Sequence, residues 1–186
     1  ITGSPDVCVG STTVLASSTT GGVWSTSDAT VADVSASGVV TGVSTGSATI
    51  TYTVTDGSGC TNSTSASVTV NATPTATVTA SGATTFCAGG SVDLTANAGT
   101  SYLWSNGAQT QTITVTTSGS YSVTVTNASG CIATSAAEAV TVNPLPTVAA
   151  ITGSPDVCVG STTTLASSTT GGVWSTSDAT VADVSA

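Results

Sequence analysis

Apolar and polar residues alternate with a period of two along most of this chain. In residues 48–54 an apolar side chain stands at every second position with threonines between, and residues 121–125 repeat the pattern with Ser and Thr. Such alternation predicts half-buried β-strands. Because Thr and Val are β-branched, the composition of these runs also favours strands. Residues 68–70 and 140–142 continue the same pattern.

Turn-forming pairs that contain glycine separate the alternating runs, as at Ser37-Gly38, Asn106-Gly107 and Ser118-Gly119. No run of useful length has the 3.6-residue period of a helix. Several short antiparallel strands in about 75 residues predict a β-sandwich. The expected fold class is therefore all-β, built of small β-sandwich domains.

The chain contains a long and nearly identical internal repeat. Residues 151–186 copy residues 1–36 with one change, from Val14 to Thr164, at a period of 150 residues. Repeats of this kind are the signature of array proteins. We expect the chain to be a piece of a longer array, with further copies of itself as its partners.

A weaker repeat lies inside the 150 residues. A Val-Thr-Val-Asn segment that ends at Asn71, followed by Pro74, recurs 72 residues later as a segment that ends at Asn143, followed by Pro146. Each occurrence predicts the last strand of a domain and a short linker. The expected organisation is two complete domains and the truncated start of a second copy of the first: residues 1–71, 72–145 and 146–186.

Alignment of the two domains on their first cysteines fixes the orientation of the following strand. Cys8 precedes Leu15 by seven residues, and Cys87 precedes Leu94 by seven. Both leucines are then expected to point inward and Val14 to point outward. A Val-to-Thr change is tolerable on a solvated face but not in a core, so the single difference between the copies agrees with this register.

The five cysteines lack the close paired spacing of a zinc site. Small domains in oxidising compartments use disulfides to supplement a modest core, so the expected location is extracellular or at the cell surface. We expect structural disulfides between Cys8 and Cys60 and between Cys87 and Cys131, each worth about 4 kcal/mol in the chain-entropy model. The partner of Cys158 would lie beyond the chain.

Each domain has one tryptophan on an expected central strand, Trp24 or Trp104. The favoured interpretation is a core anchor, because one buried aromatic supplies much of the apolar burial of a small sandwich. The alternative is an exposed platform on which a sugar ring stacks. Tyr102 shares a face with Trp104, and Tyr121, just after a glycine at the start of a late strand, is a candidate tyrosine corner.

The charge excludes several classes of function. The chain has no Lys, Arg or His and nine acidic residues, for a net charge of −9. Nucleic-acid binding requires cations that neutralise phosphates, and an anionic membrane surface would repel the chain. No apolar run approaches the 18–20 residues of a membrane span, and the residues that usually serve as general acids and bases are nearly absent. We therefore expect no nucleic-acid partner, no membrane insertion and no enzymatic activity.

Calcium is the one metal that the acidic charge brings into question, because it binds six to eight oxygens. Asp28 and Asp33 are close in sequence, and Asp6 and Asp56 stand near Cys8 and Cys60, but no Asp-x-Asp-x-Asp-Gly loop is present. We interpret the aspartates as turn caps and expect no metal, no cofactor and no catalytic residue.

Two segments resemble known families. The run from Val23-Trp24 through Gly38-Val-Val-Thr-Gly42 to Ile50 resembles the bacterial immunoglobulin-like domain of group 2. Residues 86–142 resemble PKD-like or Ig-like tandem repeats of large secreted surface adhesins or filament proteins of gliding bacteria and their relatives. The motifs that carry this second resemblance are Cys87-Ala-Gly-Gly, Tyr102-Leu-Trp-Ser-Asn-Gly107, Gly119-Ser-Tyr-Ser-Val-Thr-Val125 and Gly130-Cys131.

Together with the repeat, the resemblance implies an all-β fold class of tandem immunoglobulin-like β-sandwich domains in an extended array. Such domains are modules of adhesins, stalks or surface filaments, and the resemblance implies no catalytic residues. The cysteines depart from the antibody pattern. Both first cysteines lie in the turn before a strand, so we expect each disulfide to lie at a domain end rather than across the core. The expected function is a structural or adhesive repeat segment of an extracellular surface protein or filament, which gives length and stiffness. The alternative is a spacer or carbohydrate-binding module of a secreted multidomain enzyme, with surface glycans as ligands.

Overall fold

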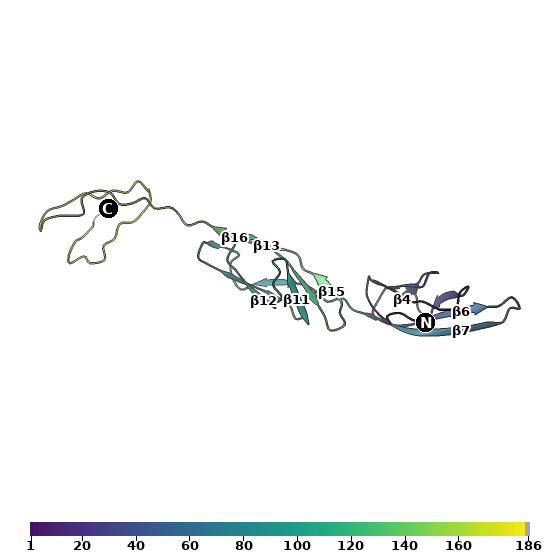
Figure 1. Ribbon diagram of the computed structural model, residues 1–186. Helices are drawn as coiled ribbons and strands as arrows, with labels where there is room; N and C mark the ends of the chain where they lie inside the picture. Colours follow the sequence, from purple (N-terminus) through teal and green to yellow (C-terminus); the bar gives the residue numbers. More distant parts are fainter. Residues whose placement is uncertain (185–186) are drawn as a thin grey trace. The chain divides into compact units, whose positions relative to one another are not determined.

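The computed structural model describes residues 1–184, which fold entirely as strands, turns and loops (Figure 1). Two compact units are present, residues 1–142 and the segment that begins at Asn143. The first unit contains two hydrophobic cores, one formed by residues between 7 and 70 and the other by residues between 92 and 140. Within residues 1–184, no helix is long and apolar enough to cross a membrane.

The first sandwich consists of two sheets that contribute to one core. The larger sheet has the order β1-β7-β6-β3, in which β1 runs parallel to β7 and the other neighbours are antiparallel. The smaller sheet has the order β2-β5-β4. The strands are β1 (Asp6–Cys8), β2 (Thr12–Val14), β3 (Val23–Thr26), β4 (Ala32–Val34), β5 (Val39–Gly42), β6 (Gly46–Thr55) and β7 (Thr61–Asn71).

The core of the first sandwich contains residues from both sheets. Ile50 on β6, Val68 on β7 and Val40 on β5 are completely buried. Leu15 is 2% exposed, whereas its neighbour Val14 is 59% exposed. The register predicted from the cysteine alignment is therefore confirmed, and the single substitution between the two copies lies on a solvated face.

The second sandwich contains three short sheets around its own core. Their orders are β12-β10-β8, β11-β14-β15 and β13-β16-β9. The strands are β8 (Val78–Ala80), β9 (Thr85–Cys87), β10 (Val92–Ala96), β11 (Ser101–Trp104), β12 (Thr112–Val115), β13 (Gly119–Tyr121), β14 (Val123–Thr126), β15 (Ile132–Thr134) and β16 (Glu138–Asn143). Leu94, Val123 and Val125 are completely buried in this core.

The alternating run over residues 121–125 belongs to two strands rather than one. β13 ends at Tyr121 and pairs with β16, whereas β14 begins at Val123 and pairs with β11 and β15. Ser122 lies between them, and its backbone forms hydrogen bonds with Ser105. The alternation correctly predicts which side chains are buried, but it does not reveal that the chain changes sheets here.

Tyr121 forms the tyrosine corner that its position predicts. Its side chain is buried, and its hydroxyl donates a hydrogen bond to the carbonyl oxygen of Thr117 at 3.1 Å. A tyrosine corner is defined by such a bond from the phenol to the backbone a few residues upstream. The bond ties the start of β13 to the turn before it.

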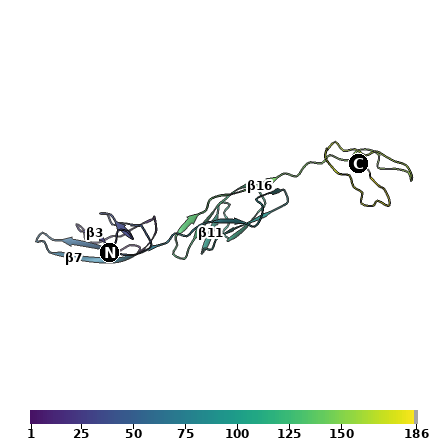
Figure 2. The ribbon, with the colours of Figure 1, turned by 180° about the vertical axis from the view of Figure 1, so that it is seen from behind.

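The described part of the second copy, up to residue 184, contains no named strand, although its sequence nearly repeats that of β1–β4 (Figures 1 and 2). One isolated bridge, Thr152 to Ala166, repeats the bridge from Thr2 to Ala16. Leu165 is 39% exposed, in contrast to its counterpart in the first sandwich. The reason is that β1–β4 all pair with β5, β6 or β7, and residues 146–186 include no counterpart of these three strands.

Two adjacent substitutions test the register of the first sandwich. Val14→Thr, the change that the second copy already carries, should alter the free energy of unfolding by less than about 0.5 kcal/mol. Leu15→Ala removes a buried side chain and should destabilise the first sandwich by about 2–5 kcal/mol. Urea unfolding followed by NMR signals of Ile50 and Val68 measures both changes. Equal effects of the two substitutions would contradict the assigned faces.

Candidate functional site at the junction between the two sandwiches

A disulfide joins the two sandwiches. It links Cys8, the last residue of β1, to Cys131, which immediately precedes β15. The two Cα atoms are 5.7 Å apart, within the usual range for a disulfide, and the two cysteines are 123 residues apart in sequence. Cys131 is 1% exposed. The bond therefore lies at the junction of consecutive domains, outside both cores.

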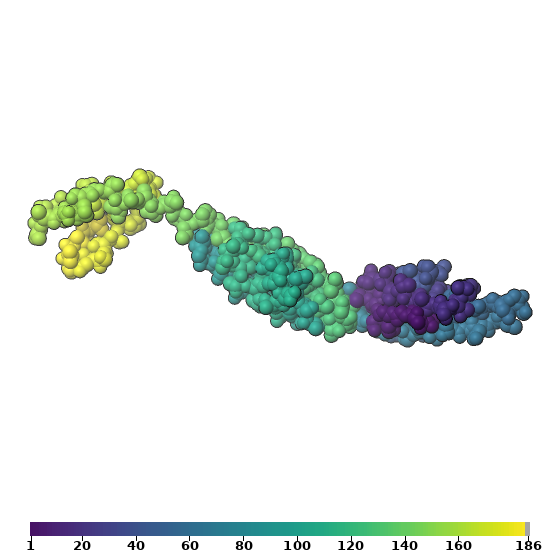
Figure 3. All heavy atoms as spheres, in the orientation of Figure 1, coloured from purple at the N-terminus to yellow at the C-terminus, as the bar shows by residue number. Residues whose placement is uncertain are grey.

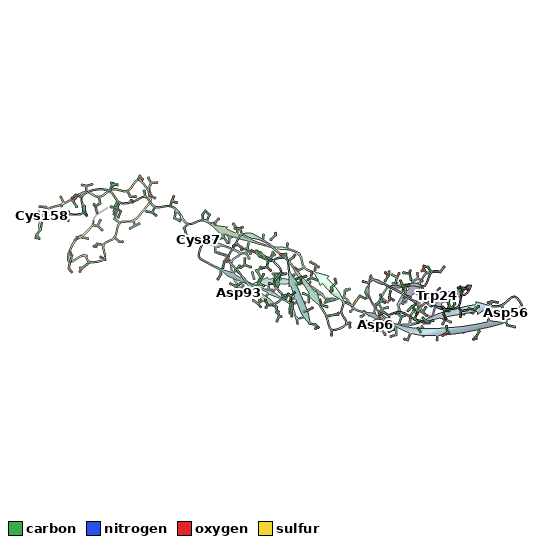
Figure 4. The ribbon with its side chains drawn as sticks, in the orientation of Figure 1. Asp6, Trp24, Asp56, Cys87, Asp93 and Cys158 are labelled. Atoms are coloured by element: carbon green, nitrogen blue, oxygen red, sulfur yellow. A yellow bond between two sulfur atoms is a disulfide. The ribbon has the colours of Figure 1, made fainter. Side chains whose placement is uncertain are left out.

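The predicted pairing of Cys8 with Cys60 is wrong. Cys8 lies beside Asn71, the last residue of β7, whereas Cys60 immediately precedes the first residue of this 11-residue strand. At about 3.3 Å per residue, the two cysteines are about 35 Å apart, whereas bonded cysteines have Cα atoms less than about 7 Å apart. Figure 4 shows Asp6 and Asp56, which lie near these cysteines, at opposite ends of the sandwich.

The predicted pairing of Cys87 with Cys131 is also wrong, for the same reason. The Sγ atom of Cys131 lies 3.9 Å from the carbonyl oxygen of Asn71, where the chain enters the second sandwich. Cys87 ends β9, which lies next to β16, the strand that leads out of the second sandwich (Figure 4). Cys60 and Cys87 are exposed free thiols, as is Cys158.

Asn127 organises the turn that presents Cys131 to the first sandwich. Its side-chain oxygen accepts hydrogen bonds from the backbone N–H groups of Ser129 at 3.1 Å and Cys131 at 3.0 Å. Its side-chain amide donates to the carbonyl oxygen of Ala72 at 2.8 Å. One side chain therefore fixes the cysteine turn and also holds the first residue of the linker.

A second asparagine binds the rest of this linker, residues 72–77, to the second sandwich. The side-chain oxygen of Asn97 accepts a hydrogen bond from the backbone N–H of Thr77, and its amide donates to the carbonyl oxygen of Thr75, both at 2.8 Å. The linker is therefore hydrogen-bonded at both ends by side chains of the second sandwich. Sequence reasoning missed the role of Asn97 and Asn127, although Asn127 stands only four residues before Cys131.

The aspartates cap turns and are not gathered at one point. The pKa of Asp28 is lowered because its carboxylate accepts hydrogen bonds from the hydroxyl and the backbone N–H of Thr30. Asp33 accepts from the N–H of Val34 at 2.9 Å. In residues 1–184 no three His, Cys, Asp or Glu side chains are close enough to hold a metal ion together.

The two tryptophans occupy different environments. Trp104 is 2% exposed in the second core, where the sequence places it, and its indole N–H donates to the carbonyl oxygen of Thr110 at 2.8 Å. Trp24 is only partly buried. It packs against the first core and against Tyr52, with ring centroids 4.7 Å apart. Trp24 and Tyr52 line a shallow surface depression together with residues 14–17, 19–22, 36 and 37.

Taken together, these features define an all-β, immunoglobulin-like β-sandwich with a covalent bond between consecutive sandwiches. Residues 9–65, the greater part of the first sandwich, match the family of the bacterial Ig-like domain (group 2). The Ig-like part of the family resemblance is therefore confirmed. The match does not extend to the second sandwich.

Several solved structures match this chain at low sequence identity. Murine CEACAM1b is 14% identical, with a TM-score of 0.36, over 74% of this chain and 96% of its own. The amphioxus IgVJ-C2 molecule is 18% identical, with a TM-score of 0.31, over 62% of this chain and 73% of its own. The S-layer protein rSbsC(31-844) is 20% identical, with a TM-score of 0.30, over 73% of this chain and 22% of its own.

No sequence among the curated proteins matches this chain. The immunoglobulin-like fold of this chain is shown by its sheets and by the family match of residues 9–65.

Substitution of Asn127 separates its two roles. Asn127→Asp keeps an oxygen for the turn but removes the amide that binds Ala72, so it should lose about 0.5–1.5 kcal/mol at the junction. The equilibrium constant for closing the Cys8–Cys131 bond in a glutathione buffer should fall about two- to tenfold. Asn127→Ala, which also loses the turn bonds, should lower it further. An unchanged equilibrium in both variants would show that the turn does not position Cys131.

Proposed function

We propose that this chain is a structural repeat segment of an extracellular surface protein or filament, in which the sandwiches provide length and the bonded junction provides stiffness. The observation that carries the proposal is the Cys8–Cys131 disulfide between consecutive Ig-like sandwiches. A flexible linker would let two domains move independently. A covalent bond beside the linker restricts that motion.

The sequence repeat supports the same function. Near-identical copies at a period of 150 residues suit a protein whose reach depends on copy number. The disulfide also favours an oxidising, extracellular location. Without Lys, Arg or His, stability comes from buried apolar side chains, hydrogen bonds and disulfides rather than from ion pairs between side chains. No catalytic activity is part of this proposal.

Force spectroscopy tests the mechanical role. When the chain is pulled from its two ends, the Cys8–Cys131 bond keeps the 123-residue loop from extending. At about 3.5 Å per residue, reduction of the bond should add about 430 Å of contour length that unfolding releases. As a control, Cys60→Ser should leave the force–extension traces of the oxidised chain and of the reduced chain unchanged. Equal contour lengths before and after reduction would contradict the role of this bond in limiting extension.

A carbohydrate-binding module is the second candidate function, and the partly exposed Trp24 in its depression favours it. Stacking of a sugar ring on Trp24 would require the indole face to be free, and Tyr52 already covers part of it. Binding of soluble glycans to the chain, lost in Trp24→Ala while the first sandwich stays folded, would favour this alternative. We expect no such binding, and Trp104→Phe is the matched control in the second sandwich.

A further inference from the structure

Three cysteines have no partner within the described residues, and two of them, Cys60 and Cys87, belong to the complete sandwiches. The bonded pair defines two kinds of position. Cys8 lies where the chain leaves the first sandwich, and Cys131 lies where the chain enters the second. The local structure around each free cysteine shows which kind of position it occupies.

Cys8 is placed by the contact of β1 with β7. The backbone N–H of Thr69 donates to the carbonyl oxygen of Pro5 at 2.8 Å, three residues before the cysteine. The chain then turns, and the N–H of Ser11 donates to the carbonyl oxygen of Cys8 at 2.9 Å. Gly10 has the positive φ that this turn requires, 78°.

Cys87 has the same surroundings in the second sandwich. The N–H of Thr141 donates to the carbonyl oxygen of Thr84 at 2.8 Å, again three residues before the cysteine. The N–H of Gly90 donates to the carbonyl oxygen of Cys87 at 3.0 Å, and Gly89 has a φ of 94°. Cys87 is therefore the exit cysteine of the second sandwich, as Cys8 is of the first.

Cys60 has the surroundings of Cys131. Asp56 takes the place of Asn127, and its side-chain oxygen accepts hydrogen bonds from the N–H groups of Ser58 and Cys60, both at 2.9 Å. The N–H of Asp56 donates to the carbonyl oxygen of Cys60 at 2.9 Å, which matches the 3.0 Å bond between Asn127 and Cys131. The turn that presents a cysteine at a domain entrance is thus already formed in the first sandwich.

This entrance turn lies at the tip of the β6–β7 hairpin, where residues 55–65 are all exposed. Figure 3 shows the tip, in blue, projecting beyond the other loops of the first sandwich. The equivalent cysteine of the second sandwich is buried because the first sandwich lies against it. Cys60 is therefore an entrance cysteine whose partner surface is not covered.

We infer that Cys87 forms a disulfide with the copy of Cys60 in a complete first sandwich that follows residue 145, and that Cys60 is bonded in the same way to the preceding copy. Each bond forms when the two thiols lose two protons and two electrons to an oxidising disulfide such as oxidised glutathione, which is itself reduced to two thiols. Every junction of the array then carries one disulfide between an exit cysteine and an entrance cysteine. Cys158, which repeats Cys8, pairs by the same rule with the next copy of Cys131. The partner of each free cysteine is thus a cysteine in another copy of this chain's own repeat.

The two kinds of junction differ at the entrance turn. Asp56 has no side-chain N–H, so it cannot donate to a linker carbonyl as Asn127 does to Ala72. Junctions that use Cys87 and Cys60 therefore depend more on the disulfide than the junction seen here. The inference uses the repeat and the positions of the cysteines, and it does not depend on the mechanical role proposed above.

An extended chain tests the inference directly. The sequence of residues 37–71 is added after Ala186, which completes the second copy of the first sandwich and brings a sixth cysteine. The protein is folded in a glutathione buffer, and its free thiols are counted with a maleimide. Two free thiols, those of Cys60 and Cys158, are expected. Four free thiols, with only the Cys8–Cys131 bond formed, would overturn the inference.

Peptide mapping identifies the bond. Asp-specific protease and chymotrypsin separate Cys60 from Cys87, because Phe86 lies between them. The copy of Cys60 lies on a peptide that ends at the copy of Asn71. The mass of this peptide therefore differs from that of the peptide that contains Cys60. A cross-linked peptide of Cys87 and the copied cysteine supports the inference. A bond of Cys87 to any other cysteine, or disulfide-linked dimers, overturns it.

Two variants and one independent sample complete the test. Cys87→Ser in the extended chain should leave three free thiols, whereas Cys60→Ser should leave the new bond intact and one free thiol. The native protein provides a measurement that does not depend on the folding of the added segment. Its non-reduced digest should contain Cys60 linked to Cys87, and their complete alkylation without reduction would overturn the inference.

Discussion

The long antiparallel pairing of β6 with β7 is the contact on which the first sandwich and its junction depend. It joins Gly46–Thr55 to Thr61–Asn71 without interruption, and its inward residues, among them Ile50 and Val68, form much of the first core. β7 also holds β1 through the parallel pairing that ends at Cys8. The same hairpin places Cys60 at the far end, so the length of β7 separates Cys60 from Cys8.

The sequence predicts the features that depend on near neighbours. Alternation identifies the buried faces of β6, β7 and β14, and a tyrosine two residues after a glycine predicts the corner at Tyr121. The second copy gives an internal comparison, because Asp178 and Thr180 form the same capped turn as Asp28 and Thr30, whereas no strand forms there in the described residues. Turns require only a few adjacent residues, and strands require partners that are distant in sequence.

The disulfide pairing was not predictable from spacing, because spacing within a domain suggests a bond within that domain. The correct partner of Cys8 is 123 residues away, and only the direction of β7 shows that Cys60 is out of reach. Asn127 was missed for a related reason. Its amide acts across the junction on Ala72, and no periodicity within one domain reveals such a contact. Asp56 and Asn127 occupy the same position in two equivalent turns. The difference between their side chains is visible in the sequence, but only the geometry of the turn shows that the amide of Asn127 contacts the linker.

The loop closed by the Cys8–Cys131 bond determines whether proteolytic cleavage separates the chain into two fragments. A single cut of the backbone anywhere between Cys8 and Cys131 leaves both fragments attached through sulfur. If the exit and entrance cysteines pair at every junction, each peptide bond of the array lies inside at least one such loop, and one nick severs nothing. Trypsin-like enzymes find no site at all, since the chain has no Lys or Arg. An array bonded in this way would keep its continuity after such a cut, without resynthesis of the damaged chain.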